Sequence, residues 1–191
     1  MMRISITALA FTILISIPVT GQQKLIDSRD KNEYKIVNIN GAIWMSENLR
    51  YKGLPGTSFF DNDENNSTSY GALYDWKTAV NACPVGWHLP SGEEFRKLMD
   101  HYGFDNTWVK GSNEAFHIQL GGHQDYQGVF FEQGESAYYW TSVEYDETNA
   151  EYFSYIIIDN KRIIDISRKE DIEDIHGSEK VNKYSVRCVQ N

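Results

Sequence analysis

Positive charge is scarce in this sequence. Its 191 residues include 18 lysines and arginines against 27 aspartates and glutamates, which gives a formal net charge of −9 at pH 7. Proteins that bind the phosphate backbone of nucleic acids need a basic surface that displaces counterions. The balance of charges therefore argues against nucleic acid as a partner.

Spacings that are typical of metal or thiol chemistry are also missing. The five histidines show no His-x-x-x-His spacing, and the only two cysteines, Cys83 and Cys188, form no Cys-x-x-Cys, so zinc is not indicated. No stretch rich in proline, glycine and serine divides the chain. We therefore expect one domain in residues 22–191, a length of about 170 residues that suits a single core.

The first 21 residues have the organisation of a signal peptide. Arg3 supplies a positive charge, the apolar run from Ile4 to Ile17 is too short to span a bilayer, and small residues precede a cleavage position after Gly21. A membrane anchor or a first core helix is the alternative. No cysteine follows the apolar run, so a lipid anchor is not indicated. We expect a mature chain without a membrane span that is secreted, periplasmic or at the cell surface.

Turn residues and apolar alternation predict the strands. Asn40-Gly41 lies between two β-prone runs and predicts a hairpin, because this dipeptide accepts the positive φ angles of a type I′ turn. Asn160-Lys161 predicts a turn between the second and third of four β-prone segments, which read AYYWTSVEY, EYFSYIIID, RIIDIS and KYSVRCVQ. Loops with short strands are expected over residues 104–133. The charged run 167–180 is expected to be a solvated loop, with a partner surface as the alternative.

Two helices are predicted between residues 70 and 103. The first has one apolar face, ends at a proline, and is marked by Leu73, Trp76, Val80 and Cys83. The second begins with a capping box formed by Ser91 and Glu94, and its apolar face is marked by Phe95, Leu98, Met99 and Tyr102. Gly103 is the expected stop of this helix.

The two cysteines are predicted to form a disulfide. Cys83 would end a core-facing helix, and Cys188 shares a strand face with Tyr184 and Val186. An exported protein folds where disulfides form and persist. Closing a loop of about 100 residues stabilises a protein by on the order of 4.7 kcal/mol in the chain-entropy model. Two buried free thiols are the alternative.

Four blocks of the sequence resemble the Fibrobacter succinogenes major paralogous domain, a family of secreted bacterial proteins. The blocks are IVNINGAIWMSENLRY, DNDENNSTSYGALYDWKTAVNACPVGWHLPSGEEF, YYWTSVE and YSVRCVQ, and with gaps they extend from Tyr34 to Val189. The resemblance implies a C-type lectin-like fold of the α+β class, with two helices, a small antiparallel sheet and a long loop-rich region. The closing SVRCV also resembles the end of the formylglycine-generating sulfatase-modifying family.

The ligand face is predicted beside a pair of glycines. Where the family usually reads Phe-Ser-Ala-Leu-Pro-Gly-Gly-Tyr-Arg, residues 116–124 read FHIQLGGHQ, so the glycines stay while the flanking chemistry changes. Segment 121–131 joins these glycines to aromatic and polar side chains, which supply stacking area and hydrogen bonds. The alternative is that Phe130 and Phe131 anchor this loop to the core. The expected border of the ligand face consists of Trp108, His123, Tyr126, Phe131 and Glu144.

Calcium is the only cofactor that the sequence leaves open. Asp61, Asp63 and Asn65 stand at alternate positions, as oxygen ligands of a calcium loop do, but the glycine and the bidentate glutamate of an EF-hand are missing. A turn that leads into a helix is the alternative. A second acidic set, Glu144 to Glu147, would either line a calcium-holding loop at a strand end or be solvated.

These observations predict a secreted or surface protein that is not an enzyme and that binds a glycan, peptide or protein. One alternative is an enzyme related in fold to the formylglycine-generating family, which relies on a pair of reactive cysteines. However, no histidine is spaced to act as the base for a cysteine, and the carboxylates are too scattered to nominate a glycosidase pair. A structural role in assembly at the cell surface is a further alternative.

Protein exported by its native host should begin near Gln22 and stay in solution without detergent, because the apolar run is removed with the signal peptide. Intact-mass spectrometry of the exported protein measures this directly. A mass that retains the residues before Gly21 would contradict the prediction.

Overall fold

The computed structural model describes residues 23–102, 116–158, 161–166 and 177–191. The predicted signal peptide, the stop at Gly103, Trp108 of the expected ligand face and Asn160 of the expected turn lie outside these residues. Within the described ranges, no helix is both long and apolar enough to cross a membrane.

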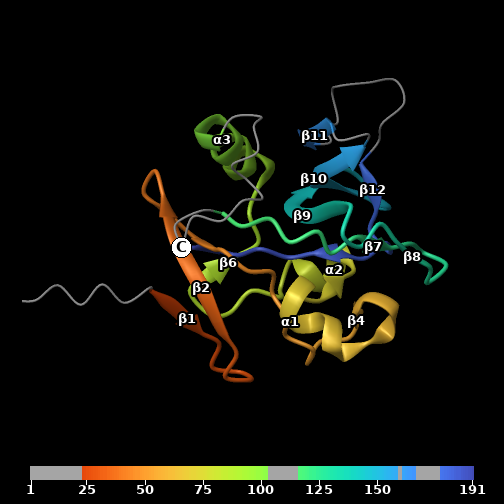
Figure 1. Ribbon diagram of the computed structural model, residues 1–191, viewed down its shortest axis with the longest axis horizontal. Coiled ribbons are helices and arrows are strands. Elements are labelled where there is room, and N and C mark those ends of the chain that lie inside the picture. The colour runs from red at the N-terminus through yellow and green to blue at the C-terminus, as the bar shows by residue number, and fades with distance from the viewer. Residues whose placement is uncertain (1–22, 103–115, 159–160, 167–176) are drawn as a thin grey trace, which may run out of the picture.

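Two sheets form the framework (Figure 1). The five-stranded sheet has the order β1-β2-β3-β14-β6, with bounds Lys24–Ile26, Glu33–Ile39, Ala42–Met45, Val189–Gln190 and Trp87–His88. The larger sheet has the order β11-β10-β9-β13-β5-β4, with bounds Lys161–Ile166, Asn149–Ile158, Ser136–Glu144, Tyr184–Ser185, Leu73–Tyr74 and Thr57–Ser58. A seventh strand, β12 (Ser178–Glu179), pairs with β10.

The helices are short. Among the described residues, only α3 (Gly92–Tyr102) is longer than about one turn. The other helices are α1 (Ser67–Tyr70), α2 (Trp76–Ala79) and two single 3₁₀ turns, Phe60–Asn62 (η1) and Glu64–Asn66 (η2). Strand accounts for 39% of the structure and helix for 18%. The predicted α+β, C-type lectin-like arrangement with a small sheet and two helices is therefore wrong. The protein is mainly β, built on two curled sheets.

The first predicted helix accounts for most of this error. Leu73 lies on β5, which pairs with β13 on one side and β4 on the other. The helix begins only at α2, where the carboxylate of Asp75 accepts a hydrogen bond from the backbone N–H of Thr78 at 2.8 Å. The spacing of the apolar residues led to a wrong prediction, because a short strand followed by one helical turn also buries Leu73 and Trp76.

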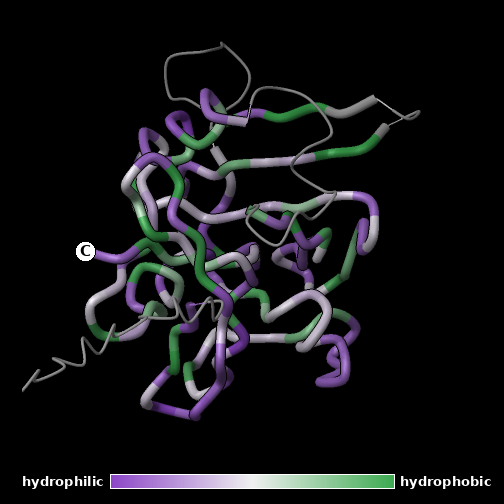
Figure 2. The backbone as a smooth tube through the Cα atoms, turned by 60° about the vertical axis from the view of Figure 1, so that its left-hand side comes forward, coloured by the Kyte–Doolittle hydropathy of each residue, from purple (hydrophilic) through white to green (hydrophobic). Residues whose placement is uncertain are grey.

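Other local predictions are confirmed. The hairpin of β2 and β3 turns at Asn40 and Gly41, whose φ angles are 50° and 90°. At the start of α3, the backbone N–H of Ser91 donates to Glu94 Oε2 at 2.8 Å, and the N–H of Glu94 donates to Ser91 Oγ at 3.3 Å. Phe95 of this helix is buried in the core. Figure 2 shows hydrophobic residues along the strands and hydrophilic residues at several outer turns.

The C-terminal segment separates two hydrophobic cores. The first core includes Tyr34, Trp140, Tyr184, Val186 and Cys188, and the second core includes Trp44, Phe95, Phe116, Tyr139 and Val189. The predicted shared face of Tyr184, Val186 and Cys188 is confirmed. However, the expected single strand is two short strands, because β13 pairs in the larger sheet and β14 in the smaller one. The cores therefore lie on opposite sides of one extended segment.

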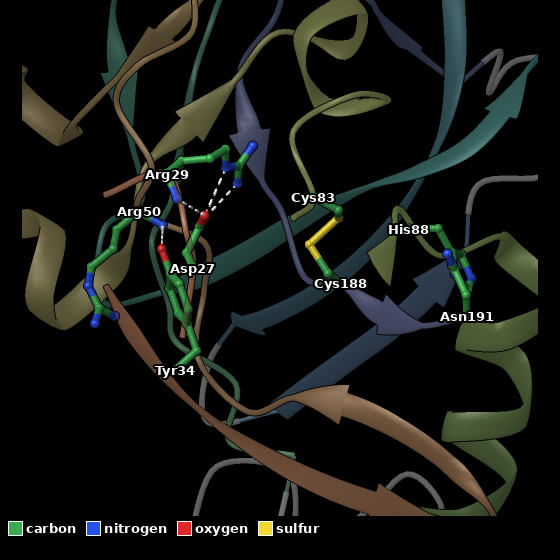
Figure 3. The surroundings of a disulfide bond; sticks show 8 residues. All are labelled: Asp27, Arg29, Tyr34, Arg50, Cys83, His88, Cys188 and Asn191. Carbon is green, nitrogen blue, oxygen red and sulfur yellow. Dashed lines mark hydrogen bonds and ion pairs between the residues drawn. A yellow bond between two sulfur atoms is a disulfide. The ribbon is translucent and has the colours of Figure 1, made fainter. Parts of the chain in front are cut away.

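The disulfide between Cys83 and Cys188 is confirmed, with the two Cα atoms 5.9 Å apart (Figure 3). It ties the turn after α2 to the segment between the sheets. Close to it, His88 joins two other parts of the chain, since its Nδ1 lies 2.8 Å from Asn191 Oδ1 and its Nε2 lies 2.9 Å from Glu94 Oε1. This histidine thus has a structural role.

The charged run before the last strands is only partly outside the sheets. Residues 167–176 are not among those described, but Ser178 and Lys180 are buried. The ammonium group of Lys180 donates to Glu144 and to the backbone carbonyl of Asp146, and it lies 4.8 Å from the centre of the Trp76 ring. The expectation of a solvated loop is therefore wrong for this end of the run, because pairing with β10 draws it into the sheet.

Replacing both cysteines by serine (Cys83→Ser with Cys188→Ser) should lower the free energy of unfolding by about 2–5 kcal/mol, because the unfolded chain gains the freedom of a large open loop. Urea denaturation measures the difference. Asn81→Ser is the control, because Asn81 is exposed and lies in the same turn. Equal stability of the double variant and the control would contradict the prediction.

Candidate functional site

A small two-stranded ribbon projects from the larger sheet (Figure 1). It consists of β7 (His123–Gln124) and β8 (Phe130–Phe131), paired antiparallel and joined by residues 125–129. Two isolated bridges, Gly122 with Ala137 and Gln124 with Lys183, attach the ribbon to the sheet. The predicted ligand segment 121–131 thus forms a single structural unit.

Gly122 allows the ribbon to fold back on itself. Its φ angle is +62°, and a Cβ atom there would lie 2.1 Å from the carbonyl oxygen of Phe131. Any other residue would therefore meet both backbone strain and a clash. This agrees with the backbone constraint predicted at the glycine pair. At the far end, Asp125 Oδ1 accepts the backbone N–H groups of Gln127 and Val129 at 2.9 and 2.8 Å, which shapes the tip.

One face of the ribbon is anchored to the body of the protein. The buried amide of Gln124 accepts a hydrogen bond from Ser58 Oγ and donates one to the carbonyl of Gly128, both at 3.0 Å. Phe130 packs against Phe60, with ring centres 5.2 Å apart. Phe130 is therefore the anchoring residue of the two phenylalanines.

The other face continues an aromatic column out of the first core. From the inside outwards, Trp140 and Tyr184 are 4.4 Å apart between ring centres, Tyr184 and Tyr138 are 5.2 Å apart, and Tyr138 and His123 are 4.9 Å apart. The last step, from His123 to Phe131, is 5.3 Å. Burial lowers the pKa of the His123 imidazole. His123 thus supports Phe131 from below as a largely uncharged ring.

The ribbon exposes an unusual amount of apolar surface. Tyr126, Val129 and Phe131 are 64%, 47% and 41% exposed, and they are three of the seven large hydrophobic side chains that are exposed among the described residues. Single exposed apolar residues are normal, whereas gathered ones are typical of interaction sites. The ribbon is therefore the candidate site.

The structure brings together three of the five predicted border residues, His123, Tyr126 and Phe131, on the ribbon. Glu144 is not among them, because it ends β9 six residues beyond Tyr138, a distance of about 20 Å along a strand. Its carboxylate is also paired with the buried Lys180.

Two of the carboxylates considered for calcium, Asp63 and Asp146, stabilise turns. Asp63 Oδ1 accepts the backbone N–H and the side-chain amide of Asn65, at 2.9 and 2.8 Å, and so caps η2. Asp146 Oδ1 accepts the N–H groups of Thr148 and Asn149, and these bonds lower the pKa of Asp146. In the part of the chain that the structure describes, no group of three His, Cys, Asp or Glu side chains is placed to hold a metal ion.

Two site residues were missed by the sequence analysis. Glu132 follows Phe131 on the ribbon, and its Oε2 accepts a hydrogen bond from Tyr138 Oη at 2.8 Å. Burial of the ring, together with this bond to the carboxylate, raises the pKa of Tyr138. Strand alternation could have identified Tyr138 as a site residue, since it shares a face with Trp140. No sequence pattern indicates that Glu132 accepts a hydrogen bond from Tyr138.

A concave region lies beside β1 and β2, where side chains of both charges meet. Its cations are already paired: Lys24 lies 2.6 Å from Glu33, and Lys35 and Arg50 lie 3.9 and 3.6 Å from the carboxylate of Glu47. This groove therefore presents satisfied ion pairs, in contrast to the uncovered apolar surface of the ribbon.

Gly122→Ala should destabilise the protein by roughly 1–3 kcal/mol, because the new methyl group meets the Phe131 carbonyl and the backbone is strained. Gly134→Ala is the matched control: its φ angle is +82°, but a Cβ atom there meets nothing within 4 Å. Thermal unfolding should show a larger loss for Gly122→Ala than for Gly134→Ala. Equal losses would mean that the close approach does not matter.

Comparison with known proteins identifies the family. The family model described as the Fibrobacter succinogenes major domain matches residues 37–190, which include both cysteines, the ribbon and most of both sheets. No curated protein matches the chain, and no solved structure matches it. The chain belongs to the Fibrobacter succinogenes major domain family.

Proposed function

We propose that this protein is a non-catalytic binding module that acts outside the cytoplasm and presents its ribbon to a glycan, peptide or protein ligand. The observation that carries the proposal is the exposure of Tyr126, Val129 and Phe131 on one ribbon. When a ligand covers exposed aromatic and aliphatic side chains, apolar surface is removed from water, and this makes the free energy of binding more favourable.

The anchoring of the ribbon supports a binding role. Its backbone is bridged to the sheet, Gln124 and Phe130 hold one face, and the aromatic column supports the other. A surface that is already ordered before binding loses little conformational entropy when the ligand arrives. The exposed side chains therefore lie on a prearranged support.

The disulfide supports both the location and the absence of catalysis. Disulfides persist mainly in oxidising compartments, which agrees with the predicted export. The alternative enzyme would need reactive thiols, and here both sulfur atoms are bonded to each other.

Tyr126→Ala and Phe131→Ala should each weaken ligand binding at least about tenfold, since exposed aromatic residues at the centre of an interface commonly contribute that much. Glycan and peptide arrays, probed with and without calcium, supply the ligand, and titration calorimetry measures the affinities. The melting temperature should not change for Tyr126→Ala, whose ring is 64% exposed, and should fall slightly for Phe131→Ala, which loses the contact with His123.

Val85→Ala is the matched control, because Val85 is 98% exposed and lies in the turn before β6. Binding that survives both aromatic substitutions would place the ligand elsewhere and refute the proposal.

A further inference from the structure

Glu132 has a backbone conformation that its side chain does not favour. Its φ angle is +62°, and it is one of five non-glycine residues with positive φ in the described chain; two of the others are asparagines, which tolerate this region better. Strained positions of this kind are often found at functional sites, where they aim a particular group. The strain at Glu132 therefore makes the position of its carboxylate a candidate functional feature.

The carboxylate of Glu132 lies beside the aromatic column. Oε2 accepts the hydrogen bond from Tyr138 Oη, which fixes the side chain, while Oε1 accepts none from the described residues. The residue is exposed and directly follows Phe131, whose ring is also exposed. A charged oxygen is thus held on the ribbon by Tyr138 of the aromatic column, and the same column supports the exposed Phe131 ring through His123.

The ribbon has no positive charge of its own to neutralise this carboxylate. Residues 121–136 contain three carboxylates and neither lysine nor arginine. His123 is largely uncharged at neutral pH, because burial lowers its pKa. The amino group of Lys183, on the bridged neighbouring segment, has Asp75 as its electrostatic partner. An aromatic ring with an adjacent carboxylate is the usual arrangement for recognising an organic cation.

We propose that the ribbon binds a basic segment of a partner protein, with a lysine or arginine head group on the Phe131 ring and paired with the Glu132 carboxylate. This inference rests on the binding function proposed above and specifies its ligand. The cation gains both the attraction of the ring face and a charge-assisted hydrogen bond.

The shape and chemistry of the ribbon favour a protein over a small cationic sugar. Small ligands bind mainly in concave pockets, whereas this ribbon projects from the sheet (Figure 1). The exposed aliphatic side chain of Val129 also suits the methylene stem of a lysine or arginine, which covers apolar surface while its head group stays paired.

The test uses a decapeptide of alternating arginine and glycine, together with the same peptide in which citrulline replaces arginine. Citrulline keeps the shape but removes the charge. Calorimetry with the whole protein should show binding of the arginine peptide and at least tenfold weaker binding of the citrulline peptide. Equal binding of the two peptides would overturn the inference, and so would failure of the arginine peptide to bind. Displacement of the arginine peptide by a glucosamine oligomer of equal charge at lower concentration would overturn the assignment to a protein.

The matched variants are Glu132→Gln and Glu147→Gln. The first keeps an acceptor for Tyr138 but removes the charge, and the second removes an exposed charge from the turn between β9 and β10. We expect at least tenfold weaker binding of the arginine peptide for Glu132→Gln and less than a twofold change for Glu147→Gln. Equal effects would show only general attraction to an acidic protein and would overturn the inference.

Stability provides a second readout. Glu132→Gly should melt about 2–4 °C above Glu132→Ala, because glycine removes the backbone strain while both variants lack the carboxylate and its bond to Tyr138. A residue kept for stability alone would show no such gain. If a ligand found on the arrays is lost with Tyr126→Ala but kept with Glu132→Gln, the binding function stands and the cation assignment fails.

Discussion

The fold depends on a buried guanidinium group. Arg187 is fully buried between the two cores, where Nε donates to Asn48 Oδ1 at 2.7 Å, Nη1 donates to the Met45 carbonyl at 3.4 Å, and Nη2 donates to the His117 carbonyl. The ring centre of Phe116 lies 4.5 Å from its Cζ. A buried charge is costly unless dipoles compensate it, so three distant segments must converge here at once. This requirement explains why the C-terminal segment runs between the sheets.

The fold was predictable where a residue acts on its own backbone. Asn40-Gly41 sets the φ angles of its own turn, and a capping box satisfies the first amides of its own helix, so both features could be read locally. Leu73 shows the limit of this approach. Its spacing from later apolar residues fits a helix, but pairing with β13, more than a hundred residues away in the chain, makes it a strand. Such long-range pairing leaves no pattern in the local sequence, and the predicted fold class was therefore wrong.

The site was partly predictable for the same reason. His123, Tyr126 and Phe131 lie in a short segment whose glycines and aromatic residues already indicated an exposed loop. Glu144 could not be judged, because its partner Lys180 comes from a distant part of the chain and occupies its carboxylate. Glu132 was missed because the ribbon holds its backbone at a positive φ angle, whereas glutamate itself favours negative φ angles.

The disulfide also determines how the protein would carry a mechanical load. It joins residues 105 positions apart and encloses the ribbon, α3 and most of the larger sheet in one covalent ring. Tension applied between the strands before Cys83 and the residues after Cys188 passes through the sulfur–sulfur bond and bypasses the enclosed chain. Pulling would therefore detach β1 to β3 and extend residues up to the ring, while the ribbon inside it remains unstretched. A load that acts between the two ends of the chain would thus leave the exposed surface of the ribbon unchanged.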